Sequence, residues 1–286
     1  DATSKVKGFE FGGVDYITKP YIKQEVLARI KTHLKISKAK KEIDSLYSDL
    51  EEKMKQAKKL HSQFLPRKLP NNNGLNISSY YNFADEIGGD FYQFIDLKDK
   101  IFFYLSDVVG HGLDGSLLNI FTGTHINNFL MNTQFNERKL DLSRLLNYLN
   151  RKFLKEGFSS NYYICLFVGY INKNQNSIVL ANAGIHTQPI KILDSKKVTK
   201  VNLKGRPIGL LDGKFEYKEK NINLRNNEKI FIGSDGIFEL KNSKSDYFDK
   251  YFYKFLEHNS KLSNLTLSNK IINYYNSFIE KNKLND

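Results

Sequence analysis

The chain has 286 residues, 40% of them hydrophobic, and a formal net charge of +13. This length and composition fit about two domains with a sizeable core, and no run of the sequence reaches the roughly 18 apolar residues of a membrane span. The basic residues are spread along the chain, and the one dense lysine region, residues 35–59, is interleaved with Glu and Asp. We therefore expect neither nucleic acid nor a membrane as a partner, whereas a basic surface favours an acidic or phosphorylated protein.

The single cysteine, Cys165, lies in the apolar run YYICLF at 162–167. One cysteine cannot form an internal disulfide, which fits a reduced, cytoplasmic protein. We interpret Cys165 as a small core residue rather than a nucleophile, because it has no basic neighbour in the sequence to activate it.

Residues 1–35 predict a short strand at 14–18, ended by Pro20, and a helix from about residue 23 to residue 34. A single strand and helix cannot bury the edge of their own sheet. We therefore expect either further chain before Asp1 or docking of this segment elsewhere. The stretches GGVDYITKP at 12–20 and EVLARI at 25–30 resemble the C-terminal third of a bacterial response-regulator receiver domain.

This resemblance implies that residues 1–35 are the C-terminal fragment of an α/β receiver domain whose phosphoacceptor aspartate lies upstream. Lys19 matches the lysine that contacts the phosphoryl group in that family, and the Lys19–Pro20 peptide bond is expected to be cis. A histidine kinase is then expected as the upstream partner.

Residues 36–70 predict a helical linker that joins two domains. The stretch 36–64 is charged, lacks Gly and Pro, and has apolar residues at steps of three and four. One interpretation is a parallel coiled coil that forms a homodimer and carries a signal. The alternative is a single amphipathic helix packed on its own domain. Pro66 and Pro70 end the helix, and the next domain is expected from residue 71. The apolar positions are Ile43, Leu46, Leu50, Met54, Ala57, Leu60 and Phe64.

Residues 71–286 contain mostly strands in their first part. Strands are predicted at 76–83, 90–97, 100–106, 162–171, 177–182 and 188–193, and near 198–203, 216–224 and 229–233. Helices are predicted at 116–130, 139–156, 245–257 and 264–281. Strands that follow one another through short polar connections predict antiparallel sheets stacked on each other and covered by helices, an α+β fold.

Three aspartates share one local arrangement. Asp107 follows the apolar strand 101–105, Asp90 follows Gly88 and Gly89 at the start of another predicted strand, and Asp235 comes after the strand near 229–233 and precedes a glycine. A carboxylate at the end of a buried strand is well placed to hold a metal ion, because packing fixes its position. Three such sites suggest convergence on one point.

Oxygen ligands without nearby Cys or paired His favour Mg²⁺ or Mn²⁺ over zinc. Two ions bridged by a carboxylate could acidify a water and neutralise the oxygens of a phosphate ester. The alternative is that these aspartates are turn formers and helix caps, a common role of Asp. The spacing alone leaves both interpretations open.

Five motifs in order resemble the PPM-type metal-dependent serine/threonine phosphatases, in particular the SpoIIE- and RsbU-like branch. They are GGDFY at 88–92, SDVVGHG at 106–112, ANAG at 181–184, GRPIGL at 205–210 and SDGIFELKN at 234–242. The resemblance runs from about residue 60 to the end and implies a helix-flanked antiparallel β-sandwich. The usual Asn-Ala-Gly-His is shifted here, because Ile185 precedes His186.

Carried over to this sequence, the resemblance implies that Asp107 bridges two metal ions, Mn²⁺ or Mg²⁺, and that the carbonyl of Val108 binds one of them. Asp90 would bind the first metal directly or through water, and Asp235 the second. The family's last ligand starts a final strand; Asp286 takes that position, and the strand after it is lacking here. No side chain serves as the nucleophile, because water activated by the metals attacks phosphorus.

Three further residues invite a role in the site. His111 could act as a general acid, but a loop histidine is more often a packing element, so we interpret it as structural. His186 is a weaker candidate. Glu239 follows Asp235 by four residues and could face the site from a helical turn, although a solvated position is the simpler interpretation.

These patterns predict a truncated response regulator whose output domain is a PPM-type phosphatase. By family analogy, the substrate is a small regulatory protein carrying phosphoserine or phosphothreonine, such as an antagonist of an anti-sigma factor. The receiver and linker would control the enzyme, by dimerising or by rotating the helix that enters it. The alternative is a catalytically silent phosphatase fold that binds a signalling partner.

Overall fold

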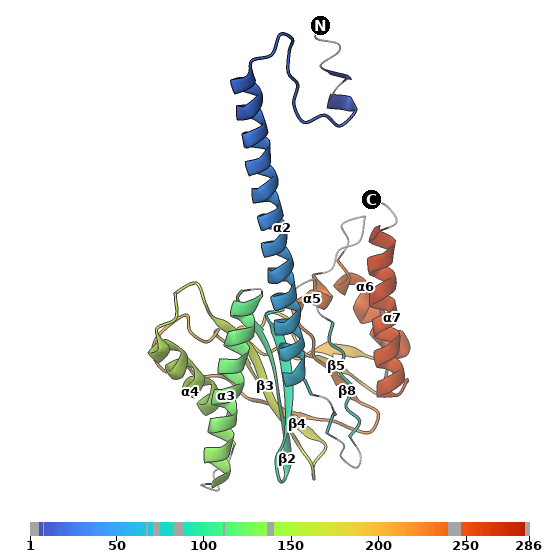
Figure 1. Cartoon of the computed structure of the whole chain (residues 1–286). Coiled ribbons are helices and arrows are strands. Elements are labelled where there is room, and N and C mark those ends of the chain that lie inside the picture. Colours follow the sequence, from blue (N-terminus) through green and yellow to red (C-terminus); the bar gives the residue numbers. More distant parts are fainter. Residues whose placement is uncertain are drawn as a thin grey trace. The chain divides into compact units, whose positions relative to one another are not determined.

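A computed structural model describes residues 6–7, 9–66, 68–70, 75–82, 88–110, 112–135, 140–239 and 247–283. The chain divides into two compact units, Asp1–Gln56 and Ala57–Asp286. The first consists of an N-terminal segment and most of the long helix α2 (Lys23–Phe64), and the second of layered sheets and helices (Figure 1). None of the described helices combines the length and the apolar character that crossing a membrane requires.

The segment 14–18 of the first unit is not a strand, so that prediction was wrong. A strand needs a neighbouring strand for its backbone hydrogen bonds, and the described part of this unit offers none. The Asp15 carboxylate instead accepts hydrogen bonds of 3.0 and 2.9 Å from the Arg29 guanidinium of α2. These bonds are the main reason that the pKa of Asp15 falls to about 2. The Lys19–Pro20 peptide bond is cis, as the receiver resemblance implied.

Helix α2 is continuous over 42 residues, where two helical stretches, 23–34 and 36–64, were predicted. It ends at Phe64, shortly before Pro66, because the residue preceding a proline disfavours the helical conformation. Within the first unit, its apolar residues Ile43, Leu46 and Leu50 are 51%, 62% and 56% exposed. The described residues of the first unit therefore leave these three apolar side chains largely uncovered.

The second unit contains two antiparallel sheets. The larger has the order β1-β2-β3-β4-β7 and the smaller the order β6-β5-β8. The larger sheet consists of β1 (Asp90–Asp96), β2 (Lys100–Val108), β3 (Ile164–Asn172), β4 (Ser177–Ala183) and β7 (Lys220–Asn223). The smaller consists of β5 (Ile190–Ile192), β6 (Val198–Lys200) and β8 (Lys229–Phe231). The helices are α3 (Leu113–Phe135), α4 (Leu142–Glu156), α5 (Asp235–Phe238), α6 (Asp249–Asn259) and α7 (Asn264–Lys283).

Four layers follow from the way the cores are shared (Figure 1). Helices α3 and α4 pack on one face of the larger sheet, the smaller sheet packs on its other face, and α6 and α7 cover the smaller sheet. Strand β3 contributes to the cores on both faces of the larger sheet, because successive side chains of a strand point to opposite faces. Leu166 and Val168 face the helices, whereas Cys165 and Phe167 face the second sheet. The predicted stacked antiparallel sheets covered by helices are confirmed.

Cys165 is a buried core residue, as predicted. Burial, together with the charges of Asp107 and Asp235, raises the pKa of its thiol to about 12. Such a thiol stays protonated and is a poor nucleophile.

The strand predicted at 76–83 is absent from residues 76–82, and Phe83 lies outside the described residues. Instead of pairing in a sheet, this segment is bound to neighbouring elements by separate hydrogen bonds, among them one from the Asn264 side chain to the Asn76 carbonyl. The Ser79 hydroxyl lies 2.9 Å from the Tyr92 hydroxyl of β1, and the Ser78 hydroxyl donates to the carbonyl of Asn264 at the start of α7 (3.4 Å).

Two of the sequence motifs pack against each other through their backbones. A Cβ atom on Gly205 would lie 1.6 Å from the Asn182 carbonyl oxygen, so only glycine fits there. Gly184 has φ +93° and packs on Pro207. The buried Asn182 amide also donates to the carbonyls of Ile185 (2.8 Å) and Leu203 (2.7 Å). The glycines of ANAG and GRPIGL are therefore explained by close packing of loops.

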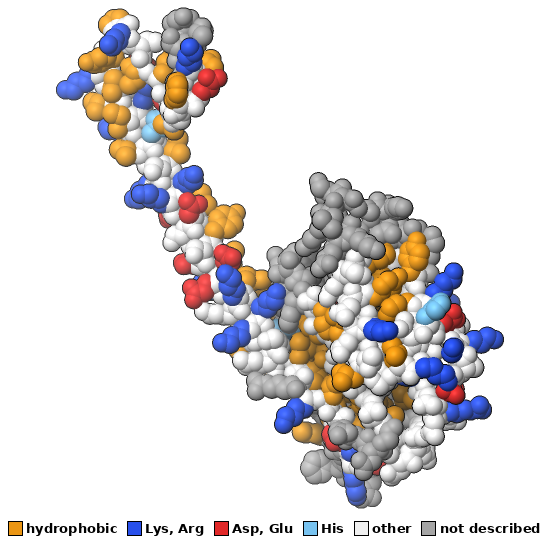
Figure 2. All heavy atoms as spheres, turned by 90° about the vertical axis from the view of Figure 1, so that its right-hand side faces the viewer, with side chains coloured by type: hydrophobic (Ala, Val, Ile, Leu, Met, Phe, Trp, Pro, Cys, Tyr) orange, Lys and Arg blue, Asp and Glu red, His pale blue; other side chains and the backbone are white. Residues whose placement is uncertain are grey.

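On the face of the second unit shown in Figure 2, Lys and Arg side chains stand apart from one another, with acidic, polar and apolar surface between them. The positive charge is thus dispersed over the described residues of this face, in line with the interpretation of the sequence.

Candidate metal centre

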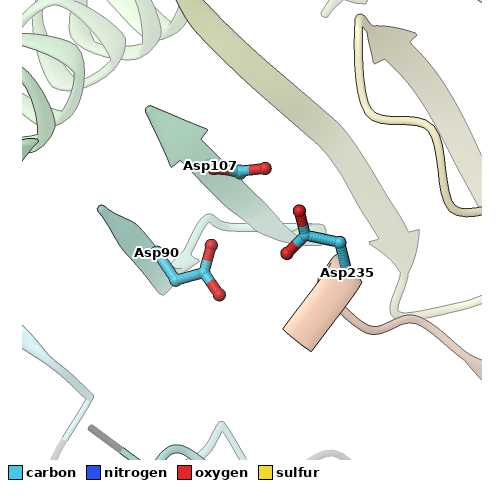
Figure 3. A group of neighbouring side chains, drawn as sticks. All are labelled: Asp90, Asp107 and Asp235. Carbon is cyan, nitrogen blue, oxygen red and sulfur yellow. The ribbon is translucent and has the colours of Figure 1, made fainter. Parts of the chain in front are cut away.

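Three carboxylates from distant parts of the second unit converge. Asp90 opens β1, Asp107 lies at the second-last position of β2, and Asp235 opens α5. One carboxylate oxygen of each lies within 4.8 Å of the others, and all three residues are half-buried. Figure 3 shows the three side chains turned toward one another. The predicted convergence is confirmed.

Glycines let the backbone around these aspartates pack closely. A Cβ atom on Gly89 would lie 2.5 Å from the Val108 carbonyl oxygen and 2.9 Å from that of Gly110. A Cβ atom on Gly115, in the first turn of α3, would lie 2.6 Å from the Gly110 carbonyl oxygen. The start of β1, the end of β2 and the start of α3 can therefore meet only because these positions lack side chains.

The carboxylates repel one another. Burial, followed by the charges of Asp90, Asp235 and Glu239, raises the pKa of Asp107 to about 7. Burial and the charge of Asp235 also raise the pKa of Asp90, against the opposing effect of a hydrogen bond with Ser234. In the described part of the chain, none of the three aspartates forms an ion pair with Lys or Arg.

Three clustered carboxylates, none paired with a described Lys or Arg, fit a divalent cation with a preference for oxygen ligands, such as Mg²⁺ or Mn²⁺. The charges of both other aspartates raise the pKa of Asp107, and a bound cation would offset this repulsion. The donor set therefore agrees with the ions that the sequence predicted.

Two residues that the sequence analysis missed hold the backbone next to Asp90. The Asn119 amide of α3 donates to the carbonyl of Gly89 (2.8 Å), and the Ser106 hydroxyl donates to the Asn119 side-chain carbonyl (2.6 Å). Asn119 is only 2% exposed, and an asparagine among the apolar residues of a predicted helix is a signal that could have identified it. The Tyr81 hydroxyl donates to the carbonyl of Asp90 (2.8 Å), and no sequence pattern marks this tyrosine.

The other predicted site residues have different outcomes. Val108 is buried, and its amide donates to the Gly89 carbonyl (3.4 Å), so it lies beside the cluster. Glu239 is exposed, and its charge nevertheless acts on Asp107. His186 and Lys19 are exposed. Asp286 and His111 lie outside the described residues. The metal-binding roles of Val108 and Asp286 stay predictions.

The fold is shared with solved phosphatase structures. The SiaA-PP2C domain of Pseudomonas aeruginosa matches with a TM-score of 0.63 and 16% identity, over 81% of this chain and 91% of that one. The PP2C phosphatase domain of SpoIIE from Bacillus subtilis, solved with a fragment of its regulatory domain, matches with a TM-score of 0.51 and 20% identity, over 65% of this chain and 54% of that one. The second unit therefore has the fold of a PPM-type (PP2C-type) phosphatase domain, and it contains the carboxylate cluster.

The sequence assigns the family within this class. The family described as Stage II sporulation protein E (SpoIIE) matches residues 98–286, and the chain belongs to it. This match includes Asp107 and Asp235 and begins after Asp90. Phosphoserine phosphatase RsbU of Bacillus subtilis (strain 168) is 22% identical over 197 residues, which cover 68% of this chain and 56% of RsbU. The chain thus spans just over half the length of this relative.

Proposed function

We propose that this chain hydrolyses phosphoserine or phosphothreonine on a small regulatory protein, with two Mn²⁺ or Mg²⁺ ions held by Asp90, Asp107 and Asp235. The observation that carries the proposal is the approach of three half-buried carboxylates to within 4.8 Å, with no ion pair to any Lys or Arg that the structure describes. Bound divalent ions would acidify a water and neutralise the oxygens of a phosphate ester. Membership of the SpoIIE family and the name of RsbU support phosphoserine as the substrate.

The protein would hold the metal ions in place through the following residues. One carboxylate oxygen of Asp107 lies within 4.8 Å of both other carboxylates, and we assign Asp107 to bridge the ions. Asp90 and Asp235 bind on either side, with the Val108 carbonyl and Asp286 as further ligands. The phosphoprotein that fits the family best is an antagonist of an anti-sigma factor.

Phosphate release from a phosphoserine protein, measured with and without Mn²⁺, tests this function. We expect turnover that depends on Mn²⁺ and is lost in Asp107→Asn. Asp96→Asn is the matched control, because Asp96 is an exposed residue at the far end of β1 that pairs with Lys173. If both variants bind a protein partner as the wild type does and no Mn²⁺-dependent turnover is found, the chain is a binding scaffold and the proposal is wrong.

We also propose that α2 forms a parallel coiled coil between two copies of the chain and transmits the state of a receiver domain phosphorylated by a histidine kinase, with Lys19 at the phosphoryl group. The exposure of Ile43, Leu46 and Leu50 along this 42-residue helix supports the proposal. Light scattering should give the mass of a dimer for the wild type and of a monomer for the double variant Leu46→Glu/Leu50→Glu. A wild-type monomer at high concentration would contradict the dimer.

A further inference from the structure

The segment 75–82 joins the start of α7 to the start of β1. At one end, the side-chain amide of Asn264 donates to the Asn76 carbonyl, and the Ser78 hydroxyl donates to the Asn264 carbonyl (3.4 Å). At the other end, the Tyr81 hydroxyl donates to the carbonyl of Asp90 (2.8 Å). The Tyr81 ring also packs beside the Tyr92 ring of β1, with 6.1 Å between their centroids. This segment therefore contacts, through Tyr81, the backbone of one residue of the carboxylate cluster.

Two successive backbone carbonyls, those of Gly89 and Asp90, accept hydrogen bonds from side chains of different parts of the fold. Asn119 of α3 binds the carbonyl of Gly89, and Tyr81 binds the carbonyl of Asp90. The peptide groups on both sides of the Asp90 Cα atom are thus fixed, and with them the direction in which the carboxylate leaves the backbone. Residues that orient a ligand in this way change metal affinity without touching the metal.

We propose that Tyr81 is a positioning residue of the metal centre, which holds Asp90 at the geometry needed to bind a divalent ion together with Asp107 and Asp235. This inference rests on the proposed function, because it requires Asp90 to be a ligand. It adds a residue from outside the family match, which begins at residue 98. The hydroxyl acts through the backbone of Asp90.

Tyr81→Phe removes the hydroxyl and keeps the ring, so the packing against Tyr92 is retained. Tyr92→Phe is the matched control, because it also removes one tyrosine hydroxyl from this region, the one beside Ser79 (2.9 Å), and leaves the bond to Asp90 intact. Calorimetric titration of the full chain with Mn²⁺ measures affinity independently of turnover. Thermal melting in a chelator measures the stability of each variant without metal.

We expect Tyr81→Phe to bind Mn²⁺ about tenfold more weakly than the wild type, and Tyr92→Phe to stay within about twofold. Replacing Tyr81 with 4-aminophenylalanine, which restores a donor, should recover most of the affinity. Equal Mn²⁺ affinities of Tyr81→Phe and the wild type would overturn the role of Tyr81 and leave the metal centre standing. A wild type that binds no Mn²⁺ would overturn the metal centre and the role of Tyr81 together.

Discussion

Asp90 and Asp107 are direct partners in the antiparallel ladder between β1 and β2. Like charges opposite each other in a sheet are destabilising, and Asp235 adds a third carboxylate within 4.8 Å. This arrangement costs stability in the absence of a cation, and a divalent ion removes the repulsion. The cluster therefore makes better sense as a metal centre than as a set of turn formers and caps.

Asp107→Asn should stabilise the chelated protein. The substitution removes one negative charge from the cluster, and we expect a gain of about 1 kcal/mol in the free energy of unfolding at pH 8. With Mn²⁺ the order should reverse, because the wild type gains stability from binding and the variant does not. Urea unfolding measures the free energy of unfolding once with EDTA and once with Mn²⁺. The control Asp96→Asn should change neither of these two free energies by more than about 0.5 kcal/mol. A loss of stability in chelator for Asp107→Asn would contradict the repulsion.

The stability of the chelated protein should fall as the pH rises from about 4 to about 7. The pKa of Asp107 is about 7 in the folded chain against an ordinary value of 3.8, so the folded state binds more protons than the unfolded state in this window. The raised pKa of Asp90 acts in the same direction. Mn²⁺ affinity should rise over the same window, because its ligands must be deprotonated.

Urea unfolding in EDTA at about pH 5 and about pH 8 tests this pH dependence. Other groups also titrate between these two pH values. We therefore compare how much the free energy of unfolding changes from the lower to the higher pH in the wild type and in Asp107→Asn. The wild type should lose more free energy of unfolding than the variant. Equal changes in both proteins would show that Asp107 titrates at an ordinary pKa in the folded state.

Gly205→Ala should be strongly destabilising, because its Cβ atom would lie 1.6 Å from the Asn182 carbonyl oxygen. We expect a loss of at least about 3 kcal/mol in the free energy of unfolding, since the backbone itself has to move. Gly213→Ala is the control: its φ is +98°, but apart from its chain neighbours no described residue has an atom within 4 Å of the added carbon, so a cost of about 1–2 kcal/mol is expected. Similar losses in both variants would mean that the loops do not pack as described.

Leu50→Pro should uncouple the phosphatase from the receiver. A proline inside α2 breaks the helix locally, while the carboxylate cluster lies in the second unit. In a chain that carries the whole receiver, Mn²⁺-dependent phosphate release should no longer respond to receiver phosphorylation, whereas Leu50→Ala should keep the response. Regulation that survives the proline would exclude α2 as the transmitter.

The three aspartates were predictable because their signal is local: each lies at the start of a predicted strand or just after the end of one, with a glycine within three residues. The partners of Tyr81 and Asn119 were not predictable, even though Asn119 stands out among apolar residues. Tyr81 binds the carbonyl of Asp90, 9 residues away along the chain, and Asn119 binds that of Gly89, 30 residues away. Only the fold brings such pairs together.

The secondary-structure predictions that were wrong also depended on contacts between residues far apart in the sequence. The stretch 76–83 has the composition of a strand, yet residues 76–82 form no strand and are bound to neighbouring elements through the Ser78 and Ser79 hydroxyls and the Asn76 carbonyl. The segment 14–18 has no partner strand in the described part of its unit. The four-residue helix α5, which places Asp235, is too short for its periodicity to be recognised in the sequence.

Anomalous diffraction from a crystal of this chain soaked in Mn²⁺ tests the central claim most directly. We predict two anomalous peaks at the cluster, one between Asp90 and Asp107 and one between Asp107 and Asp235, each about 2.1 Å from a carboxylate oxygen. Well-ordered aspartates with no peak between them, at a Mn²⁺ concentration that supports phosphate release, would contradict the claim.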